Sequence, residues 1–166
     1  MNDKKVKDKT MKDKAIKIET IKNKEMINKE ITDEGLKGNE KIEQAVAMLQ
    51  QNASEEVLAH VLTVIRRRVR ENGQVIVAVE PDKGDGVMHI QAVKTPDGKT
   101  WWMAFTSFEE ELKGSDSVMS TFLTDIGKMF KSSLDVDEIS GIILNPWNRT
   151  IMLDKSLISI ILGNNI

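Results

Sequence analysis

The run Val75–Val79 constrains the fold of this 166-residue chain more than any other segment. It reads VIVAV, so every side chain is apolar and four of the five are β-branched. Side chains of a strand alternate between two faces, so a run without polar residues predicts a strand that is covered on both faces. Other elements of the chain must supply that cover, which favours a layered α+β fold.

The segments before this strand have helical spacing. Apolar residues recur at i, i+3, i+4 and i+7 in two stretches: Ile42, Ala45, Val46 and Leu49, then Leu58, Val61, Leu62, Ile65 and Val69. Ser54 is placed to cap the second helix, and Gly73 is placed to end it. The two stretches therefore predict a helical hairpin.

The segments after it predict a β-hairpin. Met88–Lys94 and Thr100–Thr106 flank Pro96-Asp97-Gly98, which is typical of a tight turn. Trp101 and Trp102 are adjacent in the second strand, so their side chains point to opposite faces.

The last third of the chain predicts a helix, two strands and a final helix. The first helix has an apolar stripe formed by Met119, Phe122, Leu123, Ile126 and Phe130. Gly141–Asn145 and Thr150–Leu153 follow as strands, and Asp154 caps a short helix that ends at Gly163. The predicted order is α-α-β-β-β-α-β-β-α: an α+β fold in which a helical hairpin precedes a mainly antiparallel five-stranded sheet with helices packed on it.

Residues 1–38 differ in composition from the rest of the chain. Residues 1–40 hold eleven Lys and nine Asp or Glu, a net charge of +2, whereas the other 126 residues have a net charge of −4. This lysine-rich, low-complexity segment predicts a tail that is disordered or transiently helical, followed by an α+β domain over residues 39–166. The alternative is a basic arm for anionic lipid, nucleic acid or a partner protein.

Few side chains are available for catalysis or metal binding. The chain has no Cys, which excludes disulfides, thiolate metal sites and cysteine nucleophiles, and is compatible with a reducing compartment. Its two histidines, His60 and His89, have no second ligand at a recognised spacing. We therefore expect no metal, no cofactor and no catalytic residues. The net charge of −2 gives no strong nucleic-acid signal, and no apolar run approaches the roughly 20 residues of a membrane span.

Two features are candidates for partner binding. Arg66, Arg67 and Arg70 project from the second predicted helix, either as a solvated face or as a site for an acidic partner. Trp147 lies in the turn between the last two strands, where it is either an exposed binding anchor or a plug folded back into the core.

The start of the segment after the hairpin also has two interpretations. Thr106 with Glu109, and Ser107 with Glu110, each fit a capping box, in which a hydroxyl and a carboxylate satisfy the first amides of a helix. The alternative is an exposed helix start that binds an anion or a peptide terminus.

Several short motifs make the chain resemble the SseB-like family, named for a bacterial "enhanced serine sensitivity" protein. They are Asn39–Leu62, Val77–Pro81, Asp97-Gly98, Phe105-Thr106-Ser107 with Glu109, and Gly141–Pro146, and the resemblance covers about residues 39–162. It implies an α+β domain of bacterial cytoplasmic proteins without established catalytic residues. Its motif positions here are Phe105, Thr106, Ser107, Asn145 and Pro146.

Two of these motifs follow strands, which suggests that they meet. We expect the Thr106–Ser107 turn and the Asn145–Trp147 turn to lie at one end of the sheet. The predicted function is a non-enzymatic, SseB-like interaction or accessory domain whose partner is another protein. The alternatives are an immunity or chaperone-like partner of a secreted toxin, and a small hydrolase-type enzyme that uses Ser107, His89 or nearby acids on a polar substrate. The oligomeric state is not predicted.

Overall fold

The apolar run forms most of strand β1 (Gln74–Val79) in the computed structural model, which describes residues 34–80, 84–114 and 120–163. Val75 and Val77 belong to the larger of two hydrophobic clusters, whereas Ile76 and Ala78 belong to the smaller one. Successive side chains thus enter different clusters, so the prediction of a strand covered on both faces is confirmed.

The predicted helical hairpin is also confirmed, as α2 (Glu40–Gln51) and α3 (Glu55–Arg70). The Ser54 hydroxyl oxygen accepts a hydrogen bond from the Val57 N–H at 3.2 Å, so Ser54 caps α3. The left-handed residue after α3 is Asn72, with a φ of 58°, rather than Gly73.

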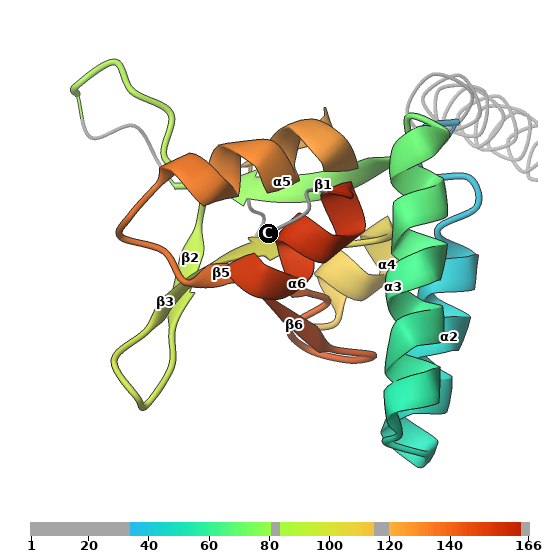
Figure 1. Ribbon diagram of the computed structural model, residues 1–166. Coiled ribbons are helices and arrows are strands. Elements are labelled where there is room, and N and C mark those ends of the chain that lie inside the picture. The colour runs from blue at the N-terminus through green and yellow to red at the C-terminus, as the bar shows by residue number, and fades with distance from the viewer. Residues whose placement is uncertain (1–33, 81–83, 115–119, 164–166) are drawn as a thin grey trace, which may run out of the picture. The chain divides into compact units, whose positions relative to one another are not determined.

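Six strands, in two groups, replace the predicted five-stranded sheet within the described residues. β1 pairs antiparallel with β4 (Ser120–Asp125). The other group has the order β2-β3-β5-β6 (Figure 1). Its strands are β2 (Ala92–Lys94), β3 (Thr100–Ala104), β5 (Gly141–Leu144) and β6 (Ile151–Asp154). β3 and β5 run parallel and the other pairs antiparallel, and single bridges join β1 to Phe105 and to Ile90.

The predicted order was wrong in the stretch that contains β4. The apolar stripe read there as one helix is a strand followed by α5 (Ile126–Asp135). Phe122 packs against the larger cluster and Leu123 against the smaller one, as adjacent residues of a strand do. With the short helix α4 (Phe108–Leu112), the order is α-α-β-β-β-α-β-α-β-β-α.

Four helices supply the larger cluster together with the strands. α2, α3, α5 and α6 (Lys155–Leu162) each contribute buried side chains to it, and α3 packs on both α5 and α6 (Figure 1). Asp154 caps α6 and Gly163 ends it with a φ of 76°, as predicted. None of the helices within the described ranges is long and apolar enough to cross a membrane.

The predicted tail lies outside the described residues up to Asp33, so its boundary with the domain stays a prediction. The residues from Gly35 onward form one compact unit. Leu36 is buried with Ile76 and Phe105, and the Gly35 carbonyl accepts hydrogen bonds from the Gln74 N–H and the Arg68 guanidinium.

Candidate functional site

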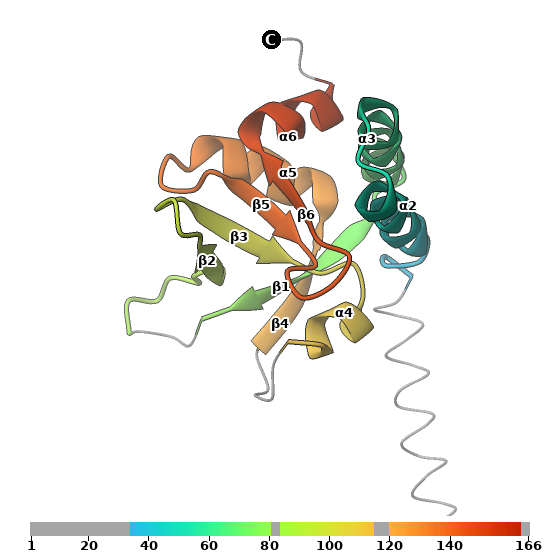
Figure 2. The ribbon, with the colours of Figure 1, turned by 90° about the horizontal axis from the view of Figure 1, so that it is seen from below.

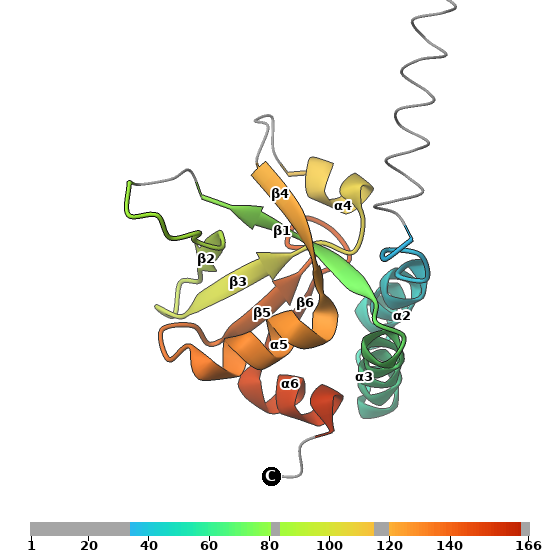
Figure 3. The same cartoon turned by 90° about the horizontal axis from the view of Figure 1, so that it is seen from above.

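The candidate site lies where the parallel strands β3 and β5 end. The carboxyl ends of parallel neighbours meet at the same edge of a sheet. From β3 the chain continues through Phe105–Ser107 into α4, and from β5 it enters the turn 145–150 that leads to β6. Figures 2 and 3 show this turn beside α4.

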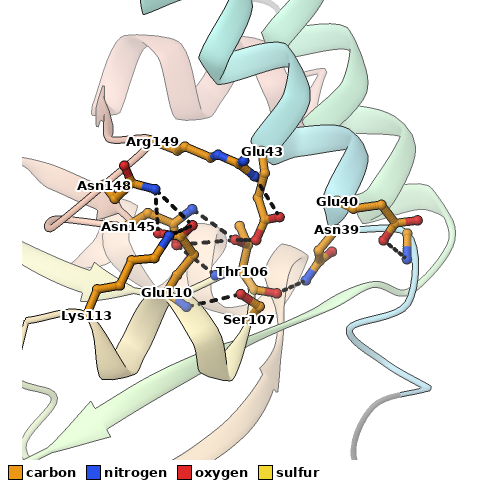
Figure 4. A network of polar contacts seen from close by, with 11 residues as sticks. Asn39, Glu40, Glu43, Thr106, Ser107, Glu110, Lys113, Asn145, Asn148 and Arg149 are labelled. Atoms are coloured by element: carbon orange, nitrogen blue, oxygen red, sulfur yellow. Dashed lines mark hydrogen bonds and ion pairs between the residues drawn. The ribbon is translucent and has the colours of Figure 1, made fainter.

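Thr106 and Asn145 join the two strand ends directly, as expected from the sequence (Figure 4). The Asn145 Oδ1 accepts the Thr106 N–H at 2.9 Å, and the Asn145 Nδ2 donates to the Thr106 Oγ1 at 2.9 Å. Both residues are buried. These motif positions therefore form one polar contact between turns that are 39 residues apart in the chain.

Helix α2 extends this contact. The Thr106 hydroxyl donates to Glu43 at 2.7 Å, and the second Glu43 oxygen lies 3.4 Å from the Arg149 guanidinium (Figure 4). Asn39, at the start of α2, donates to the Thr106 carbonyl and accepts from the Arg68 Nε. The helical hairpin is thus tied to the strand ends through buried or half-buried polar groups.

The turn after β5 has an unusual backbone. Asn145 and Arg149 both have a positive φ, of 53° and 49°. Side chains other than that of glycine make this conformation unfavourable, and asparagine tolerates it better than most residues. The contacts of Asn145 and Arg149 with Thr106 and Glu43 hold the turn in this shape.

Helix α4 exposes its two apolar side chains and buries two of its three acidic residues. Phe108 and Leu112 are 37% and 68% exposed, whereas Glu110 and Glu111 are 2% and 7% exposed. Glu110 accepts from Lys113 at 3.1 Å and from Asn148 at 3.2 Å, which links α4 to the turn (Figure 4).

The capping prediction for this helix is confirmed for Ser107 only and in its hydroxyl half, because the Glu110 carboxylate accepts from Lys113 and Asn148 instead of reaching back to Ser107. The Ser107 hydroxyl oxygen accepts the Glu110 N–H at 3.2 Å, so Ser107 is the cap. Thr106 does not cap α4, because its side chain is buried against Glu43 and Asn145.

Trp147 is exposed, at 43%, but one face of its ring is covered. A Cβ added at Gly114 would lie 2.1 Å from indole atoms of Trp147, so the ring rests on the glycine that follows α4. This arrangement favours the exposed alternative over a core plug. We call the exposed apolar side chains Phe108, Leu112 and Trp147 the α4–Trp147 surface.

Glu111, the third acidic residue of α4, has a shifted pKa. Burial raises the pKa of its carboxyl group above the usual glutamate value. Among residues 34–80, 84–114 and 120–163, no side chain forms an ion pair or hydrogen bond with its carboxylate. Its carboxylate oxygens are not among the fully buried, unpartnered side-chain atoms of the described residues, so they keep contact with solvent.

The predicted basic candidates lie elsewhere. Arg67 and Arg70 are exposed on α3, and the half-buried Arg66 lies against Gly163 at the end of α6. Figure 2 shows α6 on the side of the domain opposite to α4. The structure therefore does not bring these arginines together with Trp147, and their role in binding stays a prediction.

The histidines are also separate from the strand ends. His89 pairs with Asp85 at 2.9 Å in the β1–β2 connection, and this hydrogen bond lowers the pKa of Asp85. His60 is exposed on α3. Within the described ranges, no three His, Cys, Asp or Glu side chains converge as metal ligands.

The sequence did not predict the contacts of Glu43 and Glu110 or the burial of Glu111. Their contacts depend on which side of α2 and α4 faces the strand ends. The signal that was available is the composition of α4, in which two apolar residues flank three acids. A short helix of this composition can bury its apolar or its acidic side chains, and the neighbouring elements decide which.

One protein family matches the chain. The SseB protein N-terminal domain family matches residues 42–159, a span that includes Thr106, Asn145 and Trp147. No curated protein and no solved structure matches the chain. Because the match covers well over half of the residues, this chain belongs to the SseB N-terminal domain family.

Proposed function

We propose that this chain is a non-enzymatic interaction domain that binds another protein through the α4–Trp147 surface. The observation that carries the proposal is the orientation of α4, which exposes Phe108 and Leu112 while it buries Glu110 and Glu111. Burial of apolar surface is the main driving force for protein association. Tryptophan is among the residues that contribute most to binding at protein interfaces.

The rigidity of the turn supports the proposal. Trp147 rests on Gly114, Asn145 is held by Thr106, and Asn148 is held by Glu110. A side chain that is already positioned loses less conformational entropy when a partner binds. Such a tryptophan is suited to act as an anchor.

Membership of the SseB N-terminal domain family and the absence of cysteine from the chain are consistent with this role. We infer that the domain acts in a bacterial cytoplasm as an SseB-like accessory protein. An immunity or chaperone-like partner of a secreted toxin is a narrower form of the same function, and it would use the same surface. The hydrolase alternative has less support, because Ser107 caps α4 and neither histidine lies beside it.

Affinity capture with surface variants tests the proposal. The full chain, Trp147→Ala and Leu112→Ser are immobilised and exposed to extract of cells that make the protein. Ile160→Ser is the matched control, since Ile160 is an exposed apolar residue on α6. We expect proteins that the wild type and the control retain to be lost from both surface variants. Equal recovery on all four proteins would contradict the proposal.

A further inference from the structure

Strand β4 has a neighbouring strand on one side only. Among the described residues it pairs with β1 alone, and Figure 3 shows no other drawn strand beyond it. Phe122 packs against the larger hydrophobic cluster and Leu123 against the smaller one, yet the residues from Thr121 to Asp125 are only half-buried. The outer edge of β4 is therefore a place where a further strand can pair.

The hydrogen bonds of β1 show which backbone groups of β4 point outward. The Ile76 N–H and C=O both bond to Phe105 at 2.9 Å, and the Ala78 C=O accepts a bond from the β1–β2 connection. Ile76 and Ala78 therefore face away from β4. Leu123 lies opposite Ile76, and Thr121 lies opposite Ala78. Because successive residues of an antiparallel pair alternate between bonded and non-bonded positions, Thr121 and Leu123 point their N–H and C=O groups to the outer edge. Within the described ranges, no residue bonds to these groups.

β4 also lacks the features that protect the other outer strands. Edge strands in natural proteins are commonly very short, or carry Lys, Pro or a bulge that prevents pairing. β2 is three residues long and ends at Lys94, and β6 is four residues long and ends at Asp154. β4 has six residues and no Lys, Pro or Gly, and its one charged residue, Asp125, is the last. Its edge is thus both long and uncharged.

The sequence of β4 fits a second copy of the same strand. Two identical antiparallel strands are related by a twofold axis, so residues close to the axis lie beside residues of the same kind. A charge in the middle of the strand would be repelled by its symmetry mate, but Ser120–Thr124 carries none. Threonine and aromatic side chains instead form favourable cross-strand pairs.

We propose that the chain forms a symmetric dimer in which β4 pairs antiparallel with β4 of a second copy. The twofold axis passes beside Phe122, so Thr121 of each copy lies opposite Leu123 of the other and their outward N–H and C=O groups bond to one another. Two β1–β4 pairs then form one four-stranded sheet, which is more stable than a two-stranded one. The dimer does not use the α4–Trp147 surface, so it is independent of the proposed function.

Sedimentation equilibrium of the full chain and two variants tests the proposal. Thr121→Pro removes an outward N–H and no hydrogen bond to β1, and edge strands tolerate proline at such positions. Thr121→Ala keeps the N–H and is the matched control. The Kd of the dimer is measured at protein concentrations up to about 1 mM. We expect a wild-type dimer, a similar Kd in Thr121→Ala, and a Kd about tenfold higher or more in Thr121→Pro, because symmetry removes two hydrogen bonds at once.

Hydrogen exchange of the wild type tests the same pairing without a variant, in case circular dichroism shows that Thr121→Pro does not fold. The Thr121 and Leu123 amides should exchange rapidly in dilute solution and slowly in concentrated solution, where the dimer forms. A monomer at every concentration would overturn the inference and leave a strand of another protein as the occupant of this edge. A dimer that persists in folded Thr121→Pro, or amides whose exchange does not depend on concentration, would overturn it as well. None of these results would contradict the proposed function.

Discussion

Asn145 combines two properties that few other residues offer. Its backbone has a φ of 53°, and its amide both accepts the Thr106 N–H and donates to the Thr106 hydroxyl. Asparagine tolerates the left-handed conformation and carries a donor and an acceptor on one side chain. Both properties are needed to close the turn onto the end of β3, which explains why a buried polar residue follows β5.

Replacing Asn145 therefore tests whether the contact between the strand ends stabilises the domain. Asn145→Ala leaves the buried Thr106 N–H unpaired and strains the backbone, so we expect the free energy of unfolding to fall by about 2 to 3 kcal/mol. Asn145→Gly removes only the side-chain contacts and should lose less. Urea denaturation followed by circular dichroism measures both, and a loss under about 0.5 kcal/mol in Asn145→Ala would refute this role.

Glu111 makes the stability of the domain depend on pH. Burial raises its pKa in the folded state, so the folded state binds the proton more tightly than the unfolded state does. Its contribution to stability is present below the unfolded pKa and is lost as pH rises through the folded pKa. Glu111→Gln should thus stabilise the domain at pH 7 by up to about 1 kcal/mol, with a smaller difference near pH 4. Denaturation of both proteins across this range measures the effect, and a difference that grows toward low pH would have the wrong sign.

Among the helices and strands, the sequence predicted those in which apolar residues recur at one regular spacing. Apolar residues in α2 and α3 follow the helical spacing, and β1 is apolar from Val75 to Val79. Helix ends were predictable as well, because Ser54 and Asp154 cap helices with their side chains and Gly163 adopts a left-handed backbone. β4 was missed because Phe122 and Leu123 face different clusters, yet together with Ile126 and Phe130 they mimic a helical stripe. Adjacent apolar residues do not reveal by themselves whether they share a face.

The packing of the turn on α4 is testable without a partner. Gly114 has no positive φ, so Gly114→Ala is compatible with the backbone, but the new Cβ would overlap the Trp147 ring. We expect the ring to move outward at a small cost in stability, since its other side is exposed. The indole N–H resonance of Trp147 should therefore shift in a ¹H–¹⁵N spectrum. The Trp101 resonance is the internal control, because Trp101 is buried and donates to Thr95, and an unchanged Trp147 resonance would contradict the packing.

At the scale of the whole domain, the site depends on pairings distant in sequence. Short motifs in the sequence indicated that Thr106 and Asn145 would meet, because both follow strands. The parallel pairing of β3 and β5 and the orientation of α4 come from tertiary contacts, which no local pattern encodes. The exposure of Trp147 likewise depends on Gly114, which is 33 residues earlier in the chain. The elements were thus largely predictable, whereas the shape and charge of the α4–Trp147 surface were not.

Site-specific photo-crosslinking in cells that make the protein shows directly whether another protein binds at α4. A photoreactive amino acid is placed at position 112 on α4 or, in a separate variant, at position 160 on α6, and both are exposed apolar positions. We expect a discrete adduct with another protein from position 112, absent from position 160 and lost when Trp147→Ala is added. Adducts only from position 160, or adducts from position 112 that persist in Trp147→Ala, would contradict this expectation.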